Sequence, residues 1–161
     1  MTSAGSTKIE FEGAHGELLA ARLDRAPGRP RAHALFAHCF TCSKDFVASA
    51  RVARGLAALG VSVLRFDFTG LGSSAGEFAN TTFSSNVEDL VRAADFLRRE
   101  HEAPALLLGH SLGGAAVLAA AGRIPEAVAV ATIGAPADPG HVTRLFANQH
   151  EEITARGEAL V

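Results

Sequence analysis

Apolar and polar positions along the chain follow two alternating patterns, short apolar runs and longer segments with helical spacing. The short runs, which are rich in β-branched or leucine side chains, predict strands at residues 9–11, 18–23, 32–37, 61–66, 105–108 and 127–133. The longer segments repeat apolar residues every three to four positions, or are rich in alanine, and predict helices at residues 46–59, 86–99 and 112–123.

This order of elements predicts the fold class. The first two strands are joined by a turn at residues 13–16 and form a hairpin, and strands then alternate with helices. Such alternation implies an α/β fold, with a mostly parallel sheet and helices on both faces. Loops at the carboxyl ends of the parallel strands are the expected place for catalytic residues.

Composition excludes several classes of protein. The 161 residues are 48% hydrophobic and 20% charged, which suits one globular domain or part of one. A formal net charge of −2 gives no support to nucleic-acid binding. The two cysteines are too few for a secreted disulfide framework, and the N-terminus lacks the apolar core of a signal peptide. The most apolar segment, 103–122, is interrupted by Pro, His, Ser and Gly, so we expect no membrane span and a cytoplasmic protein.

The strongest chemical signal is the pentapeptide Gly109-His110-Ser111-Leu112-Gly113, between a predicted strand and a predicted helix. A serine at the tip of a strand-to-helix turn needs a strained backbone, and small residues two positions before and after it avoid clashes. The following helix offers free N–H groups to a developing oxyanion. We therefore predict Ser111 as a nucleophile and the N–H of Leu112 as one oxyanion donor.

A second loop, His38-Cys39-Phe40-Thr41, directly follows the predicted strand at 32–37. The equivalent loop of a serine hydrolase supplies the other oxyanion donor, and we expect the N–H of Phe40 to have this role, with His38 and Cys39 supporting the loop. The Gly- and Ser-rich segment 67–80 lacks the lysine and spacing of a phosphate-binding loop. No metal or organic cofactor is expected.

Three motifs together resemble the α/β-hydrolase superfamily. HCFT at 38–41 stands where the family has its HG-x oxyanion motif, DFTGLGSS at 67–74 where it has D-x-R-G-x-G-x-S, and GHSLGG at 109–114 where it has its nucleophile elbow. These segments resemble, more narrowly, bacterial hydrolases that are often fused to a C-terminal OsmC-like domain. Cys39 and Thr69 depart from the usual glycine and arginine. The resemblance implies hydrolysis of a small ester, thioester or related acyl substrate, by Ser111.

The resemblance covers residues 8–137, with 138–161 expected to begin a lid region that includes a loosely predicted helix at 141–160. Serine hydrolases of this fold place the catalytic acid and base after the nucleophile. Neither His141 nor His150 follows a predicted strand, so the domain is expected to be truncated after about its sixth strand and the isolated chain to have little esterase activity. An apolar edge strand at 127–133 would then favour self-association.

Two alternatives remain, a thiol redox protein and a non-catalytic binding module. Cys39 and Cys42 form a C-x-x-C between a strand and a helix, which is the context of a dithiol redox site. A zinc site is weaker, because no second ligand pair has suitable spacing. Finally, a pocket without acid and base could be a non-catalytic module that binds an acyl ligand.

Overall fold

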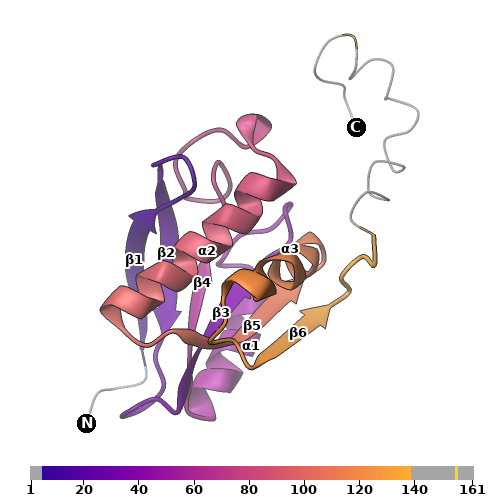
Figure 1. The fold of residues 1–161 in the computed structure, drawn as a ribbon. Helices are drawn as coiled ribbons and strands as arrows, with labels where there is room; N and C mark the ends of the chain where they lie inside the picture. The colour runs from indigo at the N-terminus through magenta and orange to yellow at the C-terminus, as the bar shows by residue number, and fades with distance from the viewer. Residues whose placement is uncertain (1–4, 139–154, 156–161) are drawn as a thin grey trace.

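The computed structural model describes residues 5–138 and 155, and it contains one six-stranded sheet (Figure 1). The strands are β1 (Ser6–Glu12), β2 (Leu18–Asp24), β3 (Ala32–Ala37), β4 (Val61–Phe66), β5 (Pro104–His110) and β6 (Ala129–Ile133). Their order across the sheet is β1-β2-β4-β3-β5-β6. β2 runs antiparallel to β1 and β4, while β4, β3, β5 and β6 are mutually parallel. The predicted hairpin and mostly parallel sheet are therefore confirmed.

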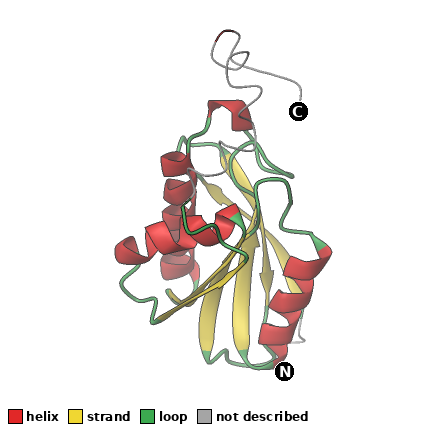
Figure 2. Ribbon diagram, turned by 90° about the vertical axis from the view of Figure 1, so that its right-hand side faces the viewer, coloured by secondary structure: helices red, strands yellow, loops and turns green. Residues whose placement is uncertain are grey.

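Helices cover both faces of this sheet (Figure 2). The helices are α1 (Val47–Ala58), α2 (Phe83–Glu100) and α3 (Leu112–Ala120), with 3₁₀ turns η1 (Phe78–Asn80) and η2 (Ala121–Arg123). The larger apolar core lies between the sheet and the α2–α3 layer, and a smaller one lies under α1. In β3 the side chain of Leu35 belongs to the first core, while Ala34 and Phe36 belong to the second. The uninterrupted apolar run of this strand reflects burial on both faces.

Element boundaries differ from the sequence prediction where capping decides them. α2 begins at Phe83 rather than at residue 86, because Thr82 and Ser85 form a reciprocal capping box. α3 ends at Ala120 and continues as the tighter turn η2. The helix expected at 141–160 falls outside the described residues. Among the described helices, none combines the length and apolar character that a membrane crossing requires.

Candidate active site

Ser111 occupies a strained turn between β5 and α3. Its φ of 53° makes it the one non-glycine residue with a positive φ in the described part of the chain. An L residue in this region costs on the order of 1–3 kcal/mol, and such strain is typical of functional sites. A Cβ on Gly109 would lie 2.5 Å from the carbonyl oxygen of Gly113, so the turn closes this tightly only without a side chain there. The predicted sharp turn is therefore present at Ser111.

Gly113 brings this turn against the end of β3. A Cβ on Gly113 would lie 2.3 Å from the carbonyl oxygen of His38 and 2.6 Å from that of Ala37. The first turn of α3 and the loop after β3 thus touch backbone to backbone. The structure consequently places the two segments that carry the predicted site residues, 38–42 and 109–113, side by side.

The start of α3 is well arranged to receive negative charge. The carbonyl of Ser111 accepts hydrogen bonds from the N–H groups of Gly114 (2.8 Å) and Ala115 (3.3 Å). The N–H of Leu112, at the first helical position, has no carbonyl four residues earlier within the helix to bind. The N–H of Ser111 donates to the carbonyl of Ile133 (2.8 Å), which ties the turn to the end of β6.

Backbone and ring contacts hold the loop after β3 in place. Nδ1 of His38 lies within hydrogen-bond distance, 2.5 Å, of the carbonyl oxygen of Cys39. The N–H of Cys42 donates to the same carbonyl at 3.0 Å. The ring of Phe40 packs edge-on against Phe68 and Phe78, with centroids 5.3 and 5.5 Å away. These contacts hold both the backbone and the side chain of Phe40 in place.

Asp67, the first residue after β4, is fully buried and connects this loop to the glycine loop. Its carboxylate accepts hydrogen bonds from the N–H of Lys44 (2.5 Å), from Lys44 Nζ (2.8 Å) and from the N–H of Ser73 (2.9 Å). Nε2 of His38 lies 3.4 Å from its Oδ1. Burial disfavours the charged form, but hydrogen bonds from these three residues outweigh burial and hold the pKa of Asp67 well below its usual range.

Sequence reasoning missed Lys44. Its side chain is buried with Asp67, although residues 43–45 lie in a polar segment of the kind that normally faces solvent. The position of Asp67 was informative, because an aspartate directly after a buried apolar strand must find hydrogen-bond or ion-pair partners. Nothing in the sequence indicates that Lys44, 23 positions earlier, is one of them.

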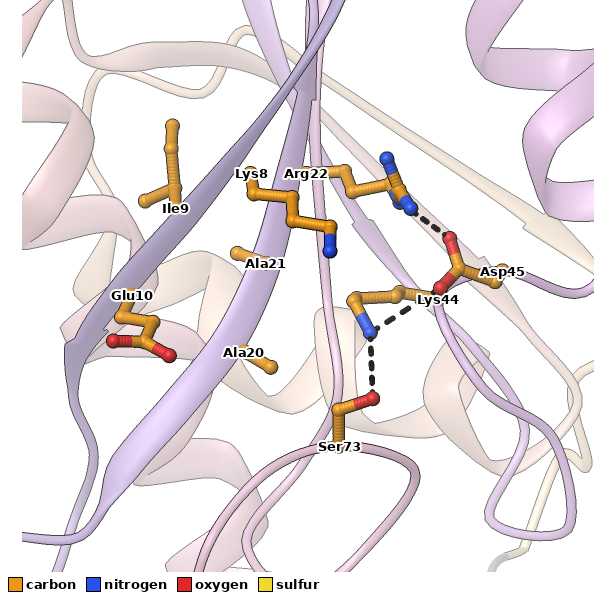
Figure 3. Close-up of a pocket in the computed structure, with 9 residues that line it drawn as sticks. All are labelled: Lys8, Ile9, Glu10, Ala20, Ala21, Arg22, Lys44, Asp45 and Ser73. Carbon is orange, nitrogen blue, oxygen red and sulfur yellow. Dashed lines mark hydrogen bonds and ion pairs between the residues drawn. The ribbon is translucent and has the colours of Figure 1, made fainter.

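A cavity of about 460 Å³ opens on the other side of Lys44 (Figure 3). Lys44 Nζ points to Ser73 Oγ at 3.3 Å, and Arg22 pairs with Asp45 at 2.7 Å on the same wall. The remaining lining residues come from β1 and β2. No lining residue belongs to segment 38–42 or 109–113, so this cavity is separate from Ser111.

Cys39 and Cys42 form a disulfide, with Cα atoms 5.3 Å apart. One ring nitrogen of His110 and the two sulfur atoms lie within 4.8 Å of one another. Thiolates and imidazole are ligands for zinc and copper, but disulfide sulfurs are not thiolates. This group could therefore hold a metal ion only after reduction.

Comparison with known proteins identifies relatives over most of the chain. The family model described as serine aminopeptidase, S33, matches residues 28–156. The mitochondrial palmitoyl-protein thioesterase ABHD10 of Mus musculus is 39% identical over 104 residues, which are 62% of this chain and 34% of the relative. The chain thus spans about a third of the length of the curated relatives it matches.

Solved structures give the same result. The esterase domain of a Rhodothermus marinus protein is 55% identical with a TM-score of 0.72, over 86% of this chain and 54% of that one. A lidless α/β serine hydrolase from Xanthomonas campestris is 26% identical with a TM-score of 0.72, over 86% of this chain and 65% of that one. These relatives are hydrolases and give no support to a redox protein as the main function. Fusion to an OsmC-like domain stays a prediction.

Proposed function

Because the chain belongs to the serine aminopeptidase S33 family of α/β hydrolases, we propose that it carries the nucleophile and oxyanion site of an acyl hydrolase. In this proposal Ser111 Oγ attacks the carbonyl carbon of an ester or thioester. The N–H groups of Leu112 and Phe40 stabilise the resulting oxyanion. The observation that carries the proposal is the positive φ of Ser111 on a turn that Gly113 packs against the loop of Phe40.

The two amide donors supply electrostatic stabilisation. Each oxyanion donor is worth about 10²–10³ in rate, because it is aimed at charge that develops only in the transition state. Leu112 adds the positive end of the α3 dipole. The hydrogen bonds around Phe40 fix its N–H before the substrate arrives, which is the preorganisation that such catalysis needs.

A serine nucleophile also needs a general base. Residues 112–138 contain no histidine. Because this fold places the base after the nucleophile in the chain, a histidine base would come from 141 or 150 or from sequence that follows in a longer protein. We infer that Ser111 in the 161-residue chain is correctly placed but weakly activated.

The substrate class follows from the relatives and is part of the proposal. One relative is named a palmitoyl-protein thioesterase and another an esterase domain. Both names describe attack on an acyl carbonyl with an oxygen or sulfur leaving group. No cofactor is needed for that reaction. We propose small carboxylic esters and thioesters as substrates.

The direct test is covalent labelling with a fluorophosphonate, followed by peptide mass spectrometry. Ser111 should be labelled slowly but in preference to the other nine serines, because in this proposal it combines a strained strand-to-helix turn with two amide donors for the phosphonyl oxygen. Ser111→Ala should abolish the label. Ser84→Ala, which changes an exposed serine of α2, is the matched control and should leave labelling intact.

Label spread over several serines, or unchanged labelling of Ser111→Ala, would refute the nucleophile assignment. Rapid, stoichiometric labelling would retain the assignment and show that the chain contains a base after all. Hydrolysis of p-nitrophenyl acetate and of an acetyl thioester by the same preparations then measures the residual rate.

A further inference from the structure

We propose that Cys39 and Cys42 are a redox-active pair whose disulfide holds the oxyanion donor Phe40 in place, so that thiol reductants slow acyl transfer at Ser111. The inference rests on the proposed function, because Phe40 matters only if its N–H receives the oxyanion. It assigns a modification site within the catalytic loop and does not make the protein an oxidoreductase.

The disulfide encloses the donor. Phe40 lies inside the four-residue ring that joins Cys39 to Cys42. Within that ring the N–H of Cys42 donates to the carbonyl of Cys39 (3.0 Å), and His38 contacts the same oxygen from outside (2.5 Å). The direction of the Phe40 N–H is therefore set by the disulfide and by the two contacts to the carbonyl oxygen of Cys39. Reduction breaks the disulfide and leaves the two contacts.

The pair is also suited to exchange. Cys39 is 7% exposed, while Cys42 is partly exposed, so an external thiol reaches Cys42 first. The hydroxyl of Thr41 lies 3.5 Å from Cys39 Sγ and must donate, since a disulfide sulfur has no proton. His110 stands beside both sulfurs. These polar neighbours can stabilise the Cys39 thiolate as it leaves.

The exchange balances with a low-molecular-weight thiol as reductant. A thiolate of the reductant attacks Cys42 Sγ and breaks the S–S bond, and Cys39 leaves as a thiolate that takes a proton from water. A second reductant thiolate attacks the mixed disulfide and releases Cys42. The protein gains two electrons and two protons, and two reductant thiols become one disulfide. Oxidised glutathione reverses the sequence.

The consequence reaches Ser111 because the two segments touch. Gly113 leaves no space between α3 and the loop that begins at His38, and His110 directly precedes the nucleophile. A looser ring lets the Phe40 N–H turn away from the oxyanion without unfolding the sheet. Because reduction loosens this donor but does not delete it, the rate of reaction at Ser111 should fall by less than the factor of about 10²–10³ for a deleted donor. We expect the rate to fall about tenfold.

The experiment compares the chain oxidised with glutathione disulfide and reduced with dithiothreitol, both with EDTA present. Thiol counting should give zero and two free thiols. Amide hydrogen exchange of the peptide spanning 38–43 should be faster in the reduced protein, with α2 unchanged as internal reference. The second-order rate of fluorophosphonate labelling at Ser111 should fall about tenfold on reduction. The double variant Cys39→Ser, Cys42→Ser should label at the slow rate under both conditions.

The outcomes separate the two proposals. Equal exchange and labelling rates within twofold in both states would overturn the redox inference and leave the nucleophile assignment standing. Faster exchange on reduction, with no label at Ser111 in either state, would instead refute the proposed function. If omission of EDTA is what slows the reduced protein, metal binding by the thiols and His110 is the cause, and loop relaxation is rejected. Failure of the disulfide to form also overturns the inference.

Discussion

At the scale of single residues, the site depends on positions where no side chain fits. A Cβ on Gly72 would lie 2.3 Å from Oδ2 of Asp67, and one on Gly113 would lie equally close to the carbonyl of His38. Gly72 thus allows the Asp67 carboxylate to approach the glycine loop, and Gly113 allows the start of α3 to approach the loop after β3. By contrast, a Cβ at Gly55 of α1 would meet nothing within 4 Å. The same residue type therefore has opposite roles at different positions.

Gly113→Ala should destabilise the protein although alanine favours helices. Its Cβ must push α3 away from β3, and overpacking of this kind costs about 1–3 kcal/mol. We expect the free energy of unfolding in urea to fall by about 2 kcal/mol, with loss of selective labelling at Ser111. The control Gly55→Ala should raise the free energy of unfolding by about 1 kcal/mol. A neutral Gly113→Ala would contradict the close approach of the two segments.

At the scale of elements, the sequence pattern predicted most of the fold. All six predicted strands and the three helices predicted before residue 138 are found, because apolar runs and helical spacing report burial directly. Boundaries were less predictable, since α2 begins where Thr82 caps it rather than where its apolar stripe begins. The turn at Ser111 was predictable from spacing. The pairing of Lys44 with Asp67 was not, because it joins two loops that become neighbours only when β3 and β4 pair.

Asp67 makes one element-scale prediction. Its pKa is depressed in the folded protein, so its contribution to stability is present above the pKa of an unfolded aspartate, near 4, and is lost as pH falls below it. Asp67→Asn removes the buried partner of the Lys44 ammonium, leaves it only the half-exposed Asp45 at 3.3 Å as an ion-pair partner, and should lower the free energy of unfolding at pH 7 by about 3 kcal/mol. Urea unfolding from pH 7 to pH 3 should show the difference between wild type and variant shrinking at the acidic end.

The exposed pair Arg98–Glu126 provides a control for this prediction. Glu126 accepts from Arg98 in a 2.6 Å ion pair at the surface, where solvent screens the interaction. Glu126→Gln should therefore leave the free energy of unfolding nearly unchanged. A difference for Asp67→Asn that is constant with pH, or no larger than that of Glu126→Gln, would contradict the structural role of the buried carboxylate.

At the scale of the whole molecule, β1 and β6 are the two edges of the sheet formed by the described residues. β6 is the last strand in the described sheet, and all five of its residues are exposed. Val130 and Ile133 are 37% and 51% exposed, and Val128, just before the strand, is 86% exposed. Apolar strands at an open edge pair readily with other chains. The expected self-association of the 161-residue chain therefore stays a prediction with a structural reason.

Sedimentation velocity at 10–200 μM (about the range where edge pairing of weak affinity becomes visible) measures that association. We expect dimers or larger species to increase with concentration. Val130→Lys should reduce them, because a charge on an edge strand opposes pairing. Val47→Lys, at an apolar residue of α1 that is 61% exposed, is the control and should have no effect. A monomer throughout this range would contradict the prediction.

The central claim is that Ser111 Oγ faces two backbone N–H groups, those of Leu112 and Phe40. A crystal structure of the phosphonylated protein measures this directly, because the phosphonyl oxygen takes the position of the oxyanion. We predict this oxygen at about 2.7–3.1 Å from both amide nitrogens. An oxygen directed into solvent, or bound by neither amide, would contradict the account.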